Sequence, residues 1–171
     1  MYIVVFLGLA TAFSKPLGAV MMPDMEKVKP QWLTSVPRIW ESVHAAVIRS
    51  INAGSATKRG LFYFFLSVGE IHTYLYDMFT GLLPQFSKRN RFIDMFVSII
   101  PLIVLTPIKK LGDVLVFSKL QNKLGGRFKA GISGGGALPS HVDKFFRTVG
   151  ISVLEGYGLT ETAPVLAVRV D

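Results

Sequence analysis

The feature that most constrains the fold of this chain is an alternation of strand and helix patterns in its last third. Residues 127–133 (RFKAGIS) have the composition of a strand, and residues 151–155 (ISVLE) predict a second one. Between them, residues 140–150 predict a short helix, which Ser140 opens with Asp143 three residues later as a short capping box. The pattern predicts a β-α-β unit, which requires parallel strands and a right-handed crossover.

A glycine-rich loop follows each of these two strands. Gly134–Gly136 come directly after the first strand, and Gly156–Gly158 come directly after the second. In open α/β sheets the ligand lies just beyond the carboxyl ends of the strands. We therefore expect the two loops to lie side by side and to mark the functional site.

The middle of the chain, about 38–124, is predicted to be helical. Apolar residues recur at helical spacing over 40–51, and seven of the chain's aromatic residues crowd into 61–79. A helix so rich in aromatics is expected to be fully buried or to line an apolar ligand such as an acyl chain. Residues 108–124 predict a basic amphipathic helix, and 25–28 predict a short helical turn.

Two apolar segments resemble targeting or membrane sequences without meeting their requirements. Residues 1–13 have no basic residue before the apolar run and no small-residue cleavage site, so we do not expect a signal peptide. Residues 96–108 are shorter than the about 20 residues that span a bilayer, and Pro101 and Pro107 interrupt them. We expect this segment to be buried in the protein, with a position at a membrane surface as the alternative.

Charge is concentrated in one stretch of the chain. The formal net charge is +8, and residues 88–129 hold nine basic and two acidic residues. These basic residues flank an apolar block and are not interleaved with aromatics, so we expect no nucleic-acid partner. Anionic lipid or an anionic ligand fits the pattern better, and a solvated basic surface explains it equally well. The absence of cysteine excludes disulfide scaffolds, cysteine-ligated metals and thiol nucleophiles.

Two familiar glycine motifs are only partly matched. The segment 156–161 begins like a dinucleotide-binding loop, but Glu161 stands where the third glycine is needed. The segment 131–135 matches the serine-hydrolase pattern around Ser133, but the one histidine that follows, His141, lies in the next helix. That position does not suit a catalytic triad, so a serine hydrolase fragment is the weaker alternative.

The chemistry of the second loop suits a nucleotide. Tyr157 lies between two glycines, where its ring can stack on a base. Thr160 offers a hydroxyl to a phosphate, and Glu161 offers the hard oxygen that Mg²⁺ prefers. From the residues alone, a nucleotide–Mg²⁺ site and a glycine turn whose tyrosine merely packs are equally supported.

Three segments carry a family resemblance. Residues 156–164 (GYGLTETAP) resemble the G-Y-G-x-T-E-x-x-P signature of the adenylate-forming enzymes. Residues 125–139 (GGRFKAGISGGGALP) and 30–41 (PQWLTSVPRIWE) are similar to segments of the long-chain fatty-acid–CoA ligases within that family. The three segments occur in the family's order and spacing, so the chain is identified as resembling an internal part of such a ligase.

The resemblance implies roles for individual residues. Tyr157, beside Gly158, would stack on adenine, and Thr160 would contact the α-phosphate and the acyl carboxylate. Glu161 would help to hold Mg²⁺, and Thr160 and Glu161 are the implied catalytic residues. Trp40 would lie near the acyl tunnel, although core packing explains it equally well. The loop against the adenine would consist of Gly134, Gly135, Gly136 and Ala137.

The implied reaction joins a fatty acid to CoA through an acyl-AMP intermediate, with ATP and Mg²⁺. The implied fold is α/β, with 1–171 as an internal part of one AMP-binding domain, a nucleotide-site unit at about 127–162 and no C-terminal domain. The positive mean hydropathy of +0.45 is then explained by the presence of core strands without the polar C-terminal domain. We expect the isolated chain to fold poorly and to be inactive. We expect a cytoplasmic location with peripheral membrane contact through 88–129, and the alternative function is a non-catalytic membrane-surface or interaction module.

Overall fold

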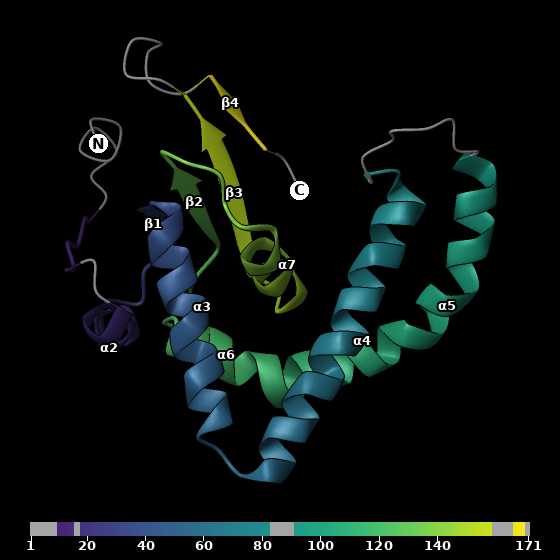
Figure 1. Ribbon diagram of the computed structural model, residues 1–171, viewed down its shortest axis with the longest axis horizontal. Helices are drawn as coiled ribbons and strands as arrows, with labels where there is room; N and C mark the ends of the chain where they lie inside the picture. The colour runs from purple at the N-terminus through teal and green to yellow at the C-terminus, as the bar shows by residue number, and fades with distance from the viewer. Residues whose placement is uncertain (1–9, 16–17, 83–90, 159–165, 170–171) are drawn as a thin grey trace.

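The computed structural model describes residues 10–15, 18–82, 91–158 and 166–169. It has a mixed α/β fold in which helices surround a small sheet of order β1-β2-β3-β4 (Figure 1). In chain order the elements are α2 (Gly18–Val28), β1 (Trp32–Ser35), α3 (Pro37–Asn52), α4 (Ala56–Thr80), α5 (Arg91–Gly112), the π-helical turn η1 (Asp113–Phe117), α6 (Ser118–Lys123), β2 (Ala130–Gly134), α7 (Ser140–Thr148), β3 (Ser152–Tyr157) and β4 (Ala167–Val168).

The predicted β-α-β unit is present. β2 and β3 are parallel neighbours, with Ser133 opposite Glu155 and Gly134 opposite Gly156. Both strands differ slightly from the expected bounds, because β2 begins only at Ala130 and β3 runs on through Tyr157.

Two further strands were not predicted. β1 pairs in parallel with β2, and β4 returns antiparallel to β3. β1 has four residues that alternate between exposed and half-buried, and both residues of β4 are exposed, so neither has the apolar run by which a strand is recognised in sequence.

The predicted capping box at the start of α7 is wrong. Ser140 is already the first helical residue, the N-cap is Pro139, and no side chain caps the helix. The Asp143 carboxylate instead binds the Arg169 guanidinium, with an Nη2 to Oδ1 distance of 2.6 Å. A charged bidentate partner is stronger than a single backbone hydrogen bond, which explains why Asp143 faces Arg169. The predicted end of the helix is confirmed, because Gly150 follows it with a φ of +76°.

The core lies between the sheet and α3, α4, α6 and α7. The apolar residues of α3 recur every three or four positions, so that they form one face toward β2 and α7. Trp40 is 1% exposed and packs edge-on against the Phe146 ring at 5.4 Å. Its ring also lies against Gly131 of β2, where a side chain would collide with it. The other core residues on α3 are Ile39, Val43 and Val47.

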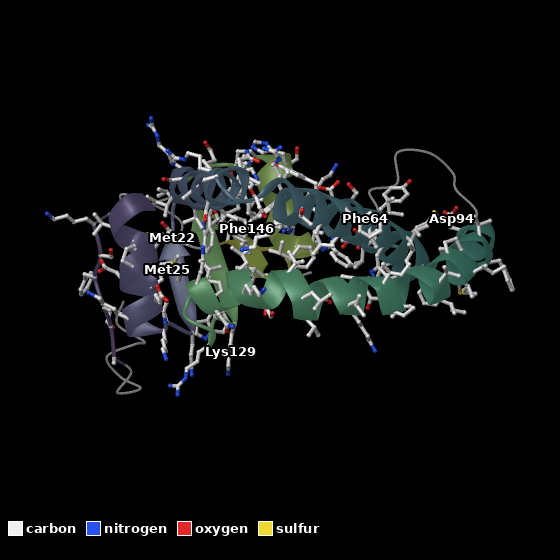
Figure 2. The ribbon with its side chains drawn as sticks, turned by 90° about the horizontal axis from the view of Figure 1, so that it is seen from below. Met22, Met25, Phe64, Asp94, Lys129 and Phe146 are labelled. Carbon is white, nitrogen blue, oxygen red and sulfur yellow. The ribbon has the colours of Figure 1, made fainter. Side chains whose placement is uncertain are left out.

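The middle of the chain forms a long helical pair that extends away from the sheet. α4 and α5 pack against each other along their length, and α5 continues through η1 into α6 (Figures 1 and 2). The helix expected at 61–79 is therefore longer, and the helix expected at 108–124 is the end of a much longer helical segment. No helix in the described part of the chain is both long and apolar enough to cross a membrane.

Two burial predictions for this region are wrong. Residues 96–108 are not buried as a segment: they belong to α5, Pro101 and Pro107 included, and the face of the helix turned away from α4 is exposed. The aromatic helix is not fully buried either. Phe62 and Phe65 of α4 are in the core, whereas Phe64 is exposed to solvent. Hydrophobic spacing identifies a helix but does not tell which of its faces meets the core.

An ion pair between α4 and α7 links the two long helices to the β-α-β unit. Arg147 of α7 donates two hydrogen bonds to the Asp77 carboxylate of α4, at 2.6 and 2.7 Å. Asp77 is buried and Arg147 is half-buried. This bidentate geometry aligns α4 with α7 and was not visible in the sequence, because the two residues are far apart in the chain.

Two histidines make the stability of this fold depend on pH. Burial lowers the pKa of His44, and the neighbouring His141 lowers it further. Burial lowers the pKa of His72, Lys109 lowers it further, and Asp113 acts in the opposite sense. Because both folded pKa values lie below the unfolded value of 6.5, the fold binds fewer protons than the unfolded chain. We expect full stability above pH 6.5 and a loss as the pH falls below it, toward the folded pKa values.

Urea unfolding at a series of pH values measures this effect. The variant with His44→Gln and His72→Gln is expected to have a flatter profile below pH 6.5, since it lacks both titrating groups. An equally steep loss of stability in the double variant would contradict the assignment.

Candidate functional site

Three segments meet at the carboxyl edge of the parallel strands. They are 36–38 after β1, 134–137 at the end of β2 and in the loop that follows it, and 156–158 at the end of β3. A side chain at Gly135 would come within 3.9 Å of Val36, and one at Gly136 within 3.7 Å of Pro37. The prediction that the two glycine loops lie side by side is confirmed, and the 30–41 segment joins them through β1.

The loop after β2 is bare backbone facing solvent. Gly135 has a φ of +83°, which residues with side chains rarely adopt, and Gly136 and Ala137 are exposed. The loop ends at Leu138, which is buried. A flat ligand can therefore approach the loop backbone without meeting a bulky side chain.

Glu155 holds the end of this loop in place. Its Oε1 accepts a hydrogen bond of 2.6 Å from the Leu138 backbone N–H. Its Oε2 lies 3.6 Å from Nη1 of Arg169, which also binds Asp143 and the Val153 carbonyl. β3, α7 and β4 thus cooperate to position the loop. Sequence analysis missed this network, because only the pairing of β4 with β3 brings Arg169 to Glu155.

We expect Glu155→Ala to loosen the glycine loop. The substitution leaves the half-buried Leu138 N–H without its acceptor, which costs about 1–3 kcal/mol of stability. Hydrogen exchange at Leu138 measures the effect directly and should become faster. Glu155→Gln is the matched control, since an amide oxygen still accepts the bond. Unchanged exchange in Glu155→Ala would show that the loop does not depend on this carboxylate.

Tyr157 presents an open ring at the edge of the site. Its side chain is 63% exposed, while its backbone carbonyl accepts a 2.8 Å hydrogen bond from Leu166 N–H. The ring is therefore not packed into the core, which favours a stacking surface over a merely structural tyrosine. Gly158 is half-buried beside it.

Thr160 and Glu161 lie outside the described residues. Both ends of their segment are nevertheless placed, because Leu166 N–H binds the Tyr157 carbonyl and Arg169 N–H binds the Glu155 carbonyl. Within the described ranges, no group of three or more histidine, aspartate or glutamate residues is arranged to hold a metal ion. The assignment of Mg²⁺ to Glu161 stays a prediction.

The structure places Trp40 in the core, and its position near an acyl tunnel stays a prediction. Ser133, the nucleophile in the serine-hydrolase alternative, is completely buried, and its hydroxyl has no hydrogen-bond partner among the described residues. This burial does not favour that alternative. The His141 ring lies 5.7 Å from the His44 ring of α3.

A separate cavity of about 690 Å³ lies between α2, α3, α4 and the η1–α6 segment. It is lined by the carboxyl-terminal half of α3, whose amino terminus starts at the strand edge, so it lies at the opposite end of α3 from the glycine loops. No residue of the three site segments lines it. The cavity is therefore not part of the candidate site.

Comparison with known proteins agrees with this geometry. A family model described as "AMP-binding enzyme" matches residues 1–171. The chain is 35% identical over 151 residues to the Arabidopsis thaliana "Probable acyl-activating enzyme 16, chloroplastic", and 34% identical over the same length to its "Long-chain-fatty-acid--[acyl-carrier-protein] ligase AEE15, chloroplastic". It is 27% identical over 144 residues to "Long chain acyl-CoA synthetase 1" of the same plant.

These matches cover 85%, 85% and 84% of this chain but only 21%, 21% and 18% of the relatives. The chain therefore spans about a fifth of the length of these relatives. No solved structure matches the chain significantly. The family match over the whole chain and the three motifs at one strand edge lead to one conclusion: the chain belongs to the family of AMP-binding enzymes.

Proposed function

We propose that this chain forms the nucleotide-binding part of a ligase that activates long-chain fatty acids with ATP. The observation that carries the proposal is the meeting of three motif segments at one strand edge, where Gly134 of the glycine loop pairs with Gly156, the neighbour of the exposed Tyr157. Bare glycine backbone and an exposed aromatic ring on adjacent strands offer surfaces against which a purine can stack. The family match and the names of the relatives support the same reaction class.

In the proposed reaction, a fatty-acid carboxylate oxygen attacks the α-phosphorus of ATP, and pyrophosphate leaves with the electron pair of the broken P–O bond. A thiol then attacks the acyl carbonyl, and AMP leaves. Tyr157 stacks on the adenine, while Gly134, Gly135, Gly136 and Ala137 cover its other side with backbone. Thr160 donates its hydroxyl to the α-phosphate.

Glu155 and Glu161 are the acidic residues nearest to this edge in sequence. The Glu155 carboxylate is engaged by Leu138 and Arg169, so it serves the loop and not a metal. Glu161 is proposed to hold Mg²⁺, which would supply positive charge to the phosphates.

We propose CoA as the thiol acceptor, and acyl carrier protein is the second candidate. The second candidate is favoured by one observation: a relative 34% identical to this chain is named as an acyl-carrier-protein ligase. Both acceptors present the same chemistry, a thiol attacking an acyl-AMP. Product analysis with each acceptor separates them.

Fatty-acid-dependent exchange of pyrophosphate into ATP tests the reaction. We expect exchange in a polypeptide that extends this chain to the length of its relatives, and none in the 171-residue chain alone. Tyr157→Ala is expected to weaken ATP binding about tenfold or more, since stacking on a base is worth about 1–3 kcal/mol. Tyr157→Phe is the control and keeps the stacking face. Equal exchange in Tyr157→Ala and the parent would contradict the role of Tyr157.

A further inference from the structure

In the helix α5 and the turn η1 the usual distribution of apolar and polar side chains between the inner and the outer face is reversed. The side chains turned away from α4 are apolar, and those turned toward it include most of the polar residues. Ser98 is completely buried, and the Thr106 hydroxyl lies 3.2 Å from the His72 ring of α4. Eight large apolar side chains, which we name the apolar stripe, are each 48–71% exposed: Phe96, Val97, Ile100, Ile103, Val104, Leu111, Val114 and Leu115.

The apolar stripe is continuous along one face of the helix. Within 96–104 and within 111–115 its members recur every three or four residues, and the seven residues from Val104 to Leu111 are about two helical turns, so both groups lie on the same side of the helix. Figure 2 shows α5, η1 and α6 in line along one side of the molecule, so the stripe runs over most of that side. From Phe96 to Leu115 it extends about 30 Å. An exposed apolar surface of this length marks a place of contact with a partner.

The charged residues near the stripe are mostly basic. Lys109 faces inward and pairs with Asp113 at 3.0 Å, whereas Lys110 is exposed at the margin of the stripe. Beyond its end follow Lys119 and Lys123, both exposed. Between 94 and 129 there are six basic residues and two acidic ones. The stripe itself contains no charged or hydrogen-bonding side chain that could select a particular protein surface.

We propose that the apolar stripe rests on an anionic membrane surface, with α5 and η1 parallel to the bilayer and their apolar side chains in the headgroup–acyl boundary. A wide apolar face next to basic residues is the pattern of helices that lie in this boundary. The basic excess provides attraction to anionic lipid. The proposal concerns the helical side of the molecule and does not depend on the proposed ligase activity. The competing occupants are the remainder of a polypeptide as long as the relatives, a second copy of this chain, or another protein.

Vesicle co-sedimentation of a polypeptide that carries this chain at the length of its relatives tests the proposal. We expect binding to phosphatidylcholine vesicles that contain about one-third phosphatidylglycerol, weaker binding to phosphatidylcholine alone, and a decrease with added salt. The variant with Ile100→Asp and Ile103→Asp should bind these vesicles at least about tenfold more weakly than the parent. The matched control is Ile71→Asp with Tyr74→Asp, which alters two α4 side chains that are each 52% exposed, and it should bind like the parent.

A fluorescent label provides a second measurement that does not depend on the aspartate variants folding. The chain has no cysteine, so an environment-sensitive dye can be attached at Val104→Cys in the stripe or at Lys144→Cys, an exposed position on α7. We expect a blue shift with anionic vesicles at position 104 and none at position 144. Equal shifts at both positions, or no shift at 104, would overturn the proposal. Loss of self-association in the Ile100→Asp and Ile103→Asp variant, with no vesicle binding by the parent, would assign the stripe to a second copy instead.

Discussion

Replacing Trp40 by alanine is expected to lower the free energy of unfolding by about 3–5 kcal/mol, the largest effect of any single substitution considered. Trp40 is 1% exposed and contacts Phe146, Phe128 and the bare backbone of Gly131. Its removal leaves a cavity that β2 and α7 cannot close without losing the parallel register that places the glycine loop. Urea unfolding followed by circular dichroism measures the effect.

The chain supplies its own control in Trp32, its other tryptophan, which is 55% exposed on β1. Trp32→Ala should change stability by less than about 1 kcal/mol, as surface substitutions generally do. Gly131→Ala should also be strongly destabilising, since its Cβ would collide with Trp40, and it should cost less when Trp40 is already alanine. Similar stabilities for Trp40→Ala and Trp32→Ala would contradict the core position of Trp40.

The second large effect is expected from the Asp77–Arg147 pair. Arg147→Ala leaves the buried Asp77 carboxylate without its two charged hydrogen bonds, and we expect a loss of about 2–4 kcal/mol. The estimate lies below that for a fully buried pair because the Arg147 side chain is 30% exposed to solvent. The same unfolding experiment applies, and amide exchange in α4 should show that the helical pair loosens from α7.

Lys144→Ala is the control for this substitution, because Lys144 is an exposed cation on the same helix. It should have little effect. The double variant Asp77→Leu and Arg147→Leu should regain much of the stability lost in Arg147→Ala, since it leaves no unpaired buried charge. If the double variant were as unstable as the single one, packing and not charge would explain the loss.

The β-α-β unit could be predicted from the sequence because its signals are local. Glycine follows each strand, and the apolar face of α7 is complete within nine residues. The meeting of the two loops followed from a general rule about parallel sheets. The helix α3 was likewise recognised from the spacing of its apolar residues, and α4 from its crowding of aromatic residues.

What could not be predicted depends on contacts between distant segments. β1 has four residues and alternates between exposed and half-buried, so it becomes a strand only by pairing with β2 about a hundred residues later. The roles of Glu155 and Arg169 depend on the return of β4. The outward face of α5 was expected to be buried, because composition does not show on which side a neighbour lies.

The central claim is that adenine binds at the carboxyl edge of β1, β2 and β3. Hydrogen exchange in the presence of a non-reactive palmitoyl-adenylate analogue tests it most directly, in a polypeptide that carries this chain at the length of its relatives. We expect slower exchange in 134–138 and 156–158, and loss of that protection in Tyr157→Ala but not in Tyr157→Phe. Protection confined to the cavity residues of α3 and α6, or none in the glycine loops, would contradict it.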